Sequence, residues 1–180
     1  MEEEVAAVVV TKYTAAAWPA DLFFHIRAKN SAVPFELMSR VMDRIKSQVR
    51  VIDETHGFRY FEGRAITGIV DGTENPSALD TPDHAVIGDE DPRFINGSYA
   101  FAQMYHHNMD ARNKLKTEQH AAAIGRKKFS DVELDAADKA KNAHNVVSTD
   151  NEGGVEHKIV RMNVPFTNPE EGLNGPSFIG

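Results

Sequence analysis

The sequence contains no cysteine. This absence excludes disulfide bonds, thiolate nucleophiles and thiolate metal ligands. An excess of basic residues is also lacking, because 20 lysines and arginines face 27 aspartates and glutamates, for a net charge of −7. Nothing in this balance favours a nucleic acid as partner, since such binding depends on neutralising phosphates with positive charge.

Long apolar runs are lacking as well. No stretch approaches the roughly 20 residues that cross a bilayer as a helix, and the apolar run from Val5 to Val10 is short even for the core of a signal peptide. The opening residues Met1 to Glu4 carry negative charge where a secretory signal needs positive charge. We therefore expect a cytoplasmic protein with no membrane partner. Its 180 residues, 41% hydrophobic and 26% charged, are typical of a soluble globular protein with one or two small domains.

The first half of the chain shows the periodicities of a strand–helix–strand unit. Apolar residues from Phe35 to Val49 recur at three- and four-residue steps, which predicts a helix over 31–49 with Pro34 in its first turn. This order favours an α+β layer with the helix on one face of an antiparallel sheet. The predicted strands lie at 21–27, 49–54 and 58–61, and residues 5–10 are compatible with another.

The second half alternates loops and strands around one long helix. That helix is predicted to stop at Gly125, one position past its last apolar residue. The predicted segments are a loop over 73–97, a strand over 97–105, a helix over 108–124, an irregular charged stretch over 127–143, a strand over 159–164, an exposed loop over 167–176 and a strand that begins at Phe178.

The chain is organised around the stretch 57–76, in which an apolar segment ends in a sharp loop. Gly72 permits a backbone turn that a Cβ would obstruct, and Pro76 pushes the preceding residue toward an extended conformation. Asp71 lies at the start of this loop, a position that can direct a carboxylate into a cavity. An ordinary hairpin turn at Asp71-Gly72 explains the same residues.

The nine residues from Gly68 to Pro76, Gly-Ile-Val-Asp-Gly-Thr-Glu-Asn-Pro, resemble the GxxDG signature of dye-decolourising peroxidases and its continuation. Members of this family are haem enzymes with two ferredoxin-like domains. The resemblance therefore implies an α+β fold of the ferredoxin-like, dimeric α/β-barrel type, with antiparallel sheets and helices on one face. It also implies one haem b per chain.

The resemblance also implies a domain organisation. Residues 1–20 have no clear counterpart in the family. We expect part of the first ferredoxin-like domain over 21–76, a connecting loop over 77–96, and part of the second domain, with the axial histidine, over 97–180. Relatives are longer at both ends, so we expect a fold that is incomplete relative to the family. A fragment, a degenerate homologue and a form completed by oligomerisation all stay open.

The axial ligand of the haem iron is implied to be His144, because the segment 141–148 resembles the family's proximal histidine segment. A lone histidine is more often a surface residue or a satisfied core residue. The flanking match and the spacing from Asp71 therefore carry this assignment. The competing histidines stand in weaker contexts, and His120 is expected to lie on a solvated helix; they are His106, His107, His120 and His157.

The predicted strand over 159–164 resembles the family's distal arginine strand. Alternation places Arg161 and Asn163 on one face of it, where polar residues on the wet side of an edge strand are an equal explanation. Gly125-Arg126 resembles a family segment whose arginine pairs with a haem propionate. A basic residue that complements a helix C-terminus explains Arg126 equally well.

The loop after the aspartate completes the implied cofactor site. Gly72, Thr73 and Glu74 are implied to follow Asp71 over the haem edge, as their counterparts do in relatives.

Together these residues imply a haem-dependent peroxidase that reduces hydrogen peroxide and oxidises an organic donor, dye-type or porphyrin-like. His144 holds the iron, and Asp71, Arg161 or both assist cleavage of the O–O bond, with Asn163 beside them. Two alternatives stay open on the same scaffold: a non-catalytic haem or porphyrin carrier, and a truncated interaction module. Exposed sheet edges in incomplete domains lead us to expect a homo-oligomer.

Overall fold

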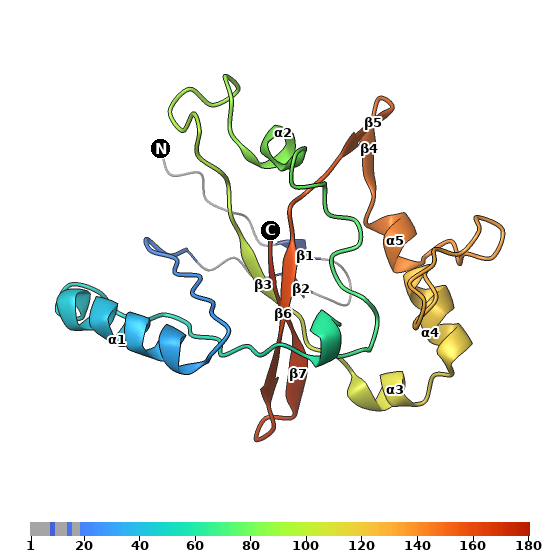
Figure 1. The fold of residues 1–180 in the computed structure, drawn as a ribbon, viewed down its shortest axis with the longest axis horizontal. Coiled ribbons are helices and arrows are strands. Elements are labelled where there is room, and N and C mark those ends of the chain that lie inside the picture. Colours follow the sequence, from blue (N-terminus) through green and yellow to red (C-terminus); the bar gives the residue numbers. More distant parts are fainter. Residues whose placement is uncertain (1–7, 10–13, 16–18) are drawn as a thin grey trace. The chain divides into compact units, whose positions relative to one another are not determined.

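The structure is a computed structural model that describes residues 8–9, 14–15 and 19–180 (Figure 1). The chain divides into two compact units, Met1–Glu54 and Thr55–Gly180. Helices and antiparallel strands are both present, so the fold class is α+β, as predicted. Among the described residues, no helix combines the length and the apolar composition needed to cross a bilayer.

The first unit contains one long helix, α1 (Ala32–Ile45), and a short antiparallel pair, β1 (Val8–Val9) and β2 (Thr14–Ala15). The prediction of this helix is confirmed, with Pro34 in its first turn, although it ends four residues early. The Asn30 side chain supports its start by accepting a hydrogen bond from the Ala32 N–H at 2.9 Å. Only Val8–Val9 of the predicted strand over 5–10 is described as a strand, and its other residues lie outside the described ranges.

The strands predicted on either side of α1 are wrong. Residues 21–27 and 49–54 form no strand. An extended segment becomes a strand only when a neighbour completes its hydrogen-bond ladder, and no described residue of this unit provides one. Their apolar side chains consequently stay accessible, with Phe23 57% exposed and Ile52 52% exposed.

The second unit is built on a three-stranded antiparallel sheet in the order β3-β7-β6 (Figure 1). Central strand β7 pairs with β6 through seven residue pairs and with β3 through three. The aromatic ring of Phe178 on β7 lies beside Phe101 and Tyr105, with centroids 5.7 and 6.2 Å away. The strands are β3 (Ala102–Met104), β6 (Met162–Asn168) and β7 (Leu173–Ile179).

Three sequence expectations are corrected by this sheet. The strand predicted over 159–164 is displaced to 162–168, and the exposed loop predicted over 167–176 shrinks to a turn between β6 and β7. The strand expected to begin at Phe178 begins at Leu173 and is the central strand. The loop was predicted because proline in a sheet is normally confined to edge strands, whereas Pro176 lies in the central strand, opposite Pro165 of the edge strand β6.

The segment before this sheet also differs from prediction. No strand forms over 58–61. The residue just before this range, Gly57, makes only an isolated bridge, with Phe166. The chain then turns through the 3₁₀ helix η1 (Phe61–Gly63). The predicted strand over 97–105 is confirmed only as the three residues of β3, and the predicted loop over 73–97 contains the short helix α2 (Thr81–Ala85).

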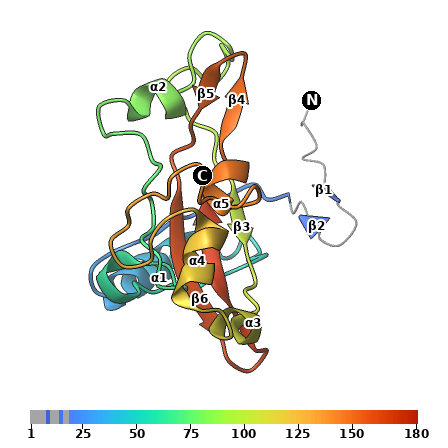
Figure 2. The ribbon, with the colours of Figure 1, turned by 90° about the vertical axis from the view of Figure 1, so that its right-hand side faces the viewer.

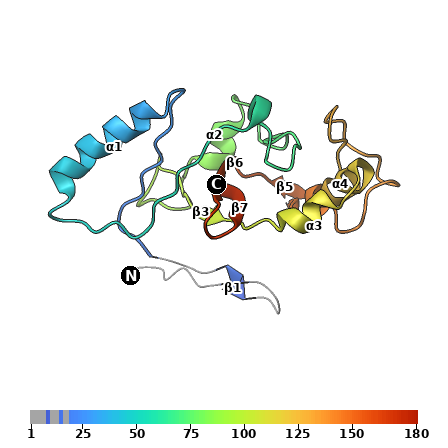
Figure 3. The ribbon, with the colours of Figure 1, turned by 90° about the horizontal axis from the view of Figure 1, so that it is seen from below.

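Helices α3, α4 and α5 lie together on one side of the sheet, as Figures 1 and 3 both show. The hairpin of β4 and β5 projects away from the sheet (Figure 2). Helix α4 ends at Gly125 in the left-handed conformation, as predicted. The stretch 127–143 is irregular, also as predicted. The bounds are α3 (Met109–Asn113), α4 (Thr117–Ile124), α5 (His144–Val147), β4 (Asp150–Glu152) and β5 (Val155–His157).

The single helix predicted over 108–124 is two helices in the structure, and His120 bridges them. The residue is only 7% exposed, and Nε2 lies 3.0 Å from the carbonyl oxygen of Arg112 near the end of α3. The expectation that His120 is solvated is therefore wrong. The second helix has its own start, because the Gln119 side chain accepts a hydrogen bond from the Lys116 N–H at 2.8 Å.

The close approach of β7 to the chain after β3 gives a first testable prediction. A Cβ at Gly175 would overlap the carbonyl oxygen of Tyr105. We expect Gly175→Ala to lower the free energy of unfolding by about 1–3 kcal/mol, the usual cost of overpacking, because the obstacle is backbone. Urea denaturation followed by circular dichroism measures this loss.

The matched control is Gly88→Ala, whose Cβ would meet only the flexible carboxylate end of Glu90. We expect its effect to stay within about 0.5 kcal/mol. Equal effects of the two substitutions would show that the β7 backbone does not approach Tyr105 this closely.

Candidate functional site

The loop that carries Asp71 is preceded by a tight turn. Arg64 and Val70 form an antiparallel bridge, and the N–H of Ala65 donates to the carbonyl oxygen of Ile69 at 3.0 Å. Gly68 within this turn and Gly72 after it have φ values of 82° and 76°, a region that side chains other than glycine rarely adopt. The two glycines of the GxxDG signature are thus explained by the backbone.

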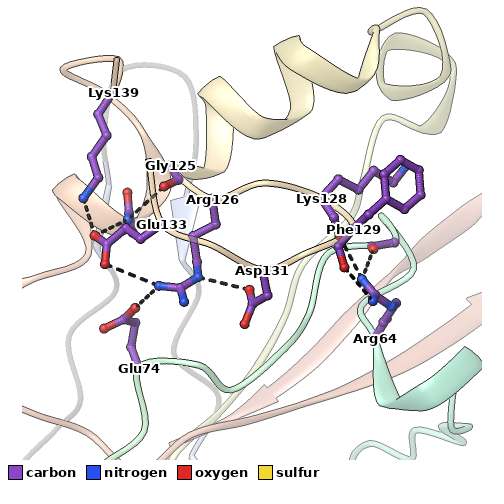
Figure 4. A network of polar contacts seen from close by, with 11 residues as sticks. Arg64, Glu74, Gly125, Arg126, Lys128, Phe129, Asp131, Glu133 and Lys139 are labelled. Atoms are coloured by element: carbon purple, nitrogen blue, oxygen red, sulfur yellow. Dashed lines mark hydrogen bonds and ion pairs between the residues drawn. The ribbon is translucent and has the colours of Figure 1, made fainter. Parts of the chain in front are cut away.

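Arg64 fastens this turn to the loop that follows α4. Its Nη1 donates to the carbonyl oxygens of Gly68 at 3.0 Å and Lys128 at 2.9 Å, and its Nη2 lies 3.4 Å from the Phe129 carbonyl oxygen (Figure 4). A guanidinium suits this role because its donors point in fixed directions. The start of the Asp71 loop is therefore held by a side chain bound to three backbone carbonyls.

Asp71 is joined to Asn163 by two hydrogen bonds. The Asn163 side-chain amide donates to Oδ1 at 2.7 Å, and the Asn163 backbone N–H donates to Oδ2 at 3.3 Å. All of these groups are partly buried. The structure thus brings together two residues that sequence reasoning placed in one site, although they stand far apart in the chain.

The same loop binds the neighbouring arginine through its backbone. The side-chain amide of Asn75 donates from Nδ2 to the Arg161 carbonyl oxygen at 2.8 Å, and its Oδ1 accepts from the Arg161 N–H at 3.0 Å. Within the part of the chain that the structure describes, the Arg161 guanidinium makes no hydrogen bond or ion pair. Its charge is therefore available to a ligand.

The candidate axial residue, His144, opens helix α5, directly after the buried Ala143. Its ring is accessible to solvent, yet protein atoms surround it closely enough to remove part of its hydration. This burial is the main cause that lowers the pKa of His144 below its ordinary value. The positive charge of Arg161 lowers it further, and the negative charge of Asp71 opposes both.

These electrostatic effects show that three predicted site residues share one region. The charges of Asp71 and Arg161 both reach the His144 imidazole. A lowered pKa keeps the imidazole neutral at neutral pH, the form in which it ligates metals. In the described ranges no hydrogen bond occupies its ring nitrogens, so the donor chemistry at His144 fits an iron ligand.

Arg126 lies among three carboxylates (Figure 4). Its Nη1 is 2.9 Å from Glu74 and 3.5 Å from Glu133, and its Nε is 3.1 Å from Asp131. Glu133 is also paired with Lys139. A propionate would compete with these carboxylates on two of the three guanidinium nitrogens, whereas Nη2 has no partner among the described residues.

The remaining loop residues lie between Asp71, which is bonded to Asn163, and Asn75, which is bonded to Arg161. Gly72 is exposed and Thr73 is partly buried, and Glu74 turns toward Arg126 rather than toward Asp71. The structure therefore gathers Asp71, Arg161 and Asn163 closely, and it links Glu74 with Arg126 in a separate cluster.

Comparison with known proteins places the chain in a family. The family model for the C-terminal part of Dyp-type peroxidases matches residues 62–180, and the model for the N-terminal part matches residues 9–59. The first match alone covers more than half of the chain. The chain belongs to the dye-decolourising peroxidase family.

Individual members of the family are similar over almost the whole chain. The dye-decolorizing peroxidase of Mycobacterium tuberculosis is 44% identical over 172 residues, which are 94% of this chain and 51% of the relative. A dye-decolorizing peroxidase structure from Bacteroides thetaiotaomicron is 49% identical with a TM-score of 0.88, covering 97% of this chain and 56% of the other. This chain thus spans about half the length of the curated relatives it matches.

A third dye-decolourising peroxidase was solved with its cofactor. A variant of DypB from Rhodococcus jostii, in complex with haem, is 43% identical with a TM-score of 0.92, covering 97% of this chain and 57% of that one. The membership of the family and the α+β fold expected from the sequence are thereby confirmed.

Sequence reasoning missed two parts of this candidate site. It quoted Asn75 as part of the motif but gave it no role, although asparagine before proline is a recognisable loop signal. It also missed Asp131 and Glu133, which lie in the charged stretch after α4 and meet Arg126 only in the folded chain. No local pattern marks these two acids.

The opposing charges on His144 give a second prediction. We expect Arg161→Gln to raise the pKa of His144 and Asp71→Asn to lower it further, because the first removes a repelling positive charge and the second an attracting negative one. An NMR titration of the ring protons in the haem-free chain measures both shifts.

The control for this titration is Arg93→Gln, an exposed arginine that stacks on Phe94 and is not among the charges acting on His144. It should leave the His144 titration unchanged. Shifts in the same direction for Arg161→Gln and Asp71→Asn would refute the shared site.

Proposed function

We propose that this protein is a haem-dependent peroxidase that reduces hydrogen peroxide and oxidises an organic donor. The observation that carries the proposal is the hydrogen-bonded arrangement of Asp71, Asn163 and the Arg161 backbone, together with the accessible imidazole of His144, on which the charges of Asp71 and Arg161 act in opposite directions. A bound haem supplies the iron centre that exchanges electrons with peroxide and with the donor. We propose that the group would be haem b, one per chain, and that His144 would hold its iron through a ring nitrogen.

Asp71 is the proposed acceptor and donor of the proton that moves between the two peroxide oxygens. Oδ1 is held by the Asn163 amide at 2.7 Å, whereas Oδ2 has only the longer 3.3 Å contact with the backbone N–H. Oδ2 is therefore the better placed oxygen for proton transfer. Asn163 serves this step by fixing the direction of the carboxylate, and orientation of an acid–base group is a large part of its effect.

Arg161 is the proposed source of positive charge beside the oxygen that departs. Its guanidinium forms no ion pair with Asp71, whose carboxylate accepts hydrogen bonds from Asn163. A preorganised cation in a partly buried site stabilises developing negative charge better than water does. Asp71 and Arg161 thus act on the peroxide as separate groups.

Arg126 is the proposed partner of a propionate, through the Nη2 that the three carboxylates leave without a partner. Gly72, Thr73 and Glu74 are proposed to line the haem edge. Glu74 supports this arrangement by holding Arg126 at 2.9 Å, which ties the loop to the cationic group.

The proposed electron donor is an organic molecule, dye-type or porphyrin-like, as the family resemblance implies. A homo-oligomer, a cytoplasmic location and the absence of nucleic acid and membrane partners are likewise our proposals. So is the division into a first domain over 21–76, a connecting loop over 77–96 and a second domain over 97–180, with residues 1–20 unassigned.

A haem titration of the purified chain is the direct test. We expect a saturable Soret band with one haem per chain, which His144→Ala abolishes or shifts because the axial nitrogen is lost. His157→Ala is the matched control, since that histidine is exposed on β5 and should leave the band unchanged. A folded wild-type chain without specific binding would refute the proposal.

A second test addresses the distal residues. We expect the double substitution Asp71→Ala and Arg161→Leu to leave haem bound but to slow the reaction with hydrogen peroxide by roughly 10²–10⁴-fold or more. Stopped-flow absorbance in the Soret region measures this rate. An unchanged rate would show that these residues do not act on peroxide.

The two tests also separate the alternative functions. Haem binding with no rapid peroxide reaction in the wild-type chain would indicate a haem carrier. A chain that binds no haem would indicate an interaction module.

A further inference from the structure

The amide of Asn75 pairs with both backbone polar groups of one residue, Arg161. It donates to the carbonyl oxygen at 2.8 Å and accepts from the N–H at 3.0 Å. A neighbouring β-strand binds a residue through the same two groups. Asn75 therefore replaces a strand at the position where Arg161 enters β6.

We propose that Asn75 is a positioning residue for Arg161, and that it aims the guanidinium at the reacting peroxide by fixing the arginine backbone. This inference rests on the proposed peroxidase function for its catalytic part. Its structural part, the control of the Arg161 backbone by Asn75, stands on the two hydrogen bonds alone.

The position of Arg161 explains why it needs such a partner. The ladder between β6 and β7 begins one residue later, at Met162. The N–H and the carbonyl of Arg161 thus lie outside the paired strands, and both bonds to Asn75 are partly buried. Buried backbone groups require partners, and within the described part of the unit Thr55–Gly180 Asn75 is the partner of both.

Asparagine is the residue type that this role requires. Its short side chain carries one donor and one acceptor, as a peptide group does, and Pro76 restricts its backbone to extended conformations. Aspartate retains the acceptor for the Arg161 N–H but lacks the donor for the carbonyl. Alanine lacks both.

The aim of Arg161 matters because displacement of a reacting group by about 1 Å can cost two orders of magnitude in rate. The guanidinium itself has no protein partner among the described residues. Its direction therefore depends on the backbone from which the side chain extends, and Asn75 holds that backbone.

The first test measures hydrogen exchange of the Arg161 amide in the haem-free full chain by NMR. We expect Asn75→Ala to reduce its protection at least about tenfold and Asn75→Asp to retain more of it, because aspartate still accepts the bond. The Asp variant also keeps the test decisive where the Ala variant does not fold. Unchanged protection in the substituted chain would overturn the proposal.

The matched control is Ser77→Ala. Ser77 lies two residues further along and bonds to Asp80, not to β6. Its substitution should leave the exchange of the Arg161 amide unchanged. Equal loss of protection in this control would mean that any change in the loop loosens the strand, which would also overturn a specific role for Asn75.

The second test is a double-mutant cycle on the haem-loaded chain, read as the rate of reaction with hydrogen peroxide. We expect Asn75→Ala to slow the reaction about 10–100-fold in the wild-type background and to have little further effect when Arg161 is leucine. The rate is compared per bound haem, because Asn75 also anchors the loop that is proposed to line the haem edge. A purely structural role would slow both backgrounds equally, and that result would overturn the proposal.

The two tests distinguish failure of this inference from failure of the proposed function. If the wild-type chain binds no haem, the peroxidase proposal fails together with the catalytic part of this one, and amide exchange still decides the structural part. If haem binds and peroxide reacts but the cycle shows no coupling between Asn75 and Arg161, only the positioning proposal fails.

Discussion

The open edge of β6 is the constraint on which the candidate site depends. β6 is the last strand of its sheet, and the backbone groups that point away from β7 need partners. No strand of the unit Thr55–Gly180 provides them among the described residues. The partners along this edge are Asn75 for both groups of Arg161, the Asp71 carboxylate for the Asn163 N–H, and the Phe58 N–H for the Pro165 carbonyl. The hydrogen bond that gives the Asn163 N–H a partner is therefore also the one that positions the Asp71 carboxylate.

This arrangement also leaves the charges of Asp71 and Arg161 without an ion pair between them, although both act on His144. A carboxylate and a guanidinium near each other usually form an ion pair. Here the Asn163 amide occupies Oδ1 of Asp71, while Asn75 binds Arg161 through the backbone and leaves its side chain unpaired within the described chain. Both charges consequently act on the imidazole of His144, where they oppose each other. A site that handles a proton and a departing anion needs both groups in this separate state.

The sequence predicts the local features of this site well and the long-range ones poorly. The stop of α4 at Gly125 and most of α1 follow from periodicity and capping, which are local. The first part of the central strand β7 falls in the predicted loop, because Gly175 and Pro176 are typical of loops and are accommodated here in the ladder with β6. The buried His120 bridges α3 and α4, which no pattern along the chain reveals. Asp71, Arg161 and Asn163 were found by resemblance to a family motif, whereas the role of Asn75 required the structure because its partner is a backbone.

A polar network connects the loop that carries Asp71 to the helix that carries His144. Glu74 binds Arg126, Arg126 approaches Glu133, and Glu133 accepts a hydrogen bond from Asn145 at 3.1 Å. Asn145 is the neighbour of His144 in α5. This path joins the loop and the helix through side chains, although Glu74 and Glu133 are partly exposed and Oδ1 of Asn145 is buried without a partner among the described residues. Glu74 and Glu133 thus have a structural role, which is to join the two sides of the site through Arg126, while one guanidinium nitrogen has no partner among the described residues.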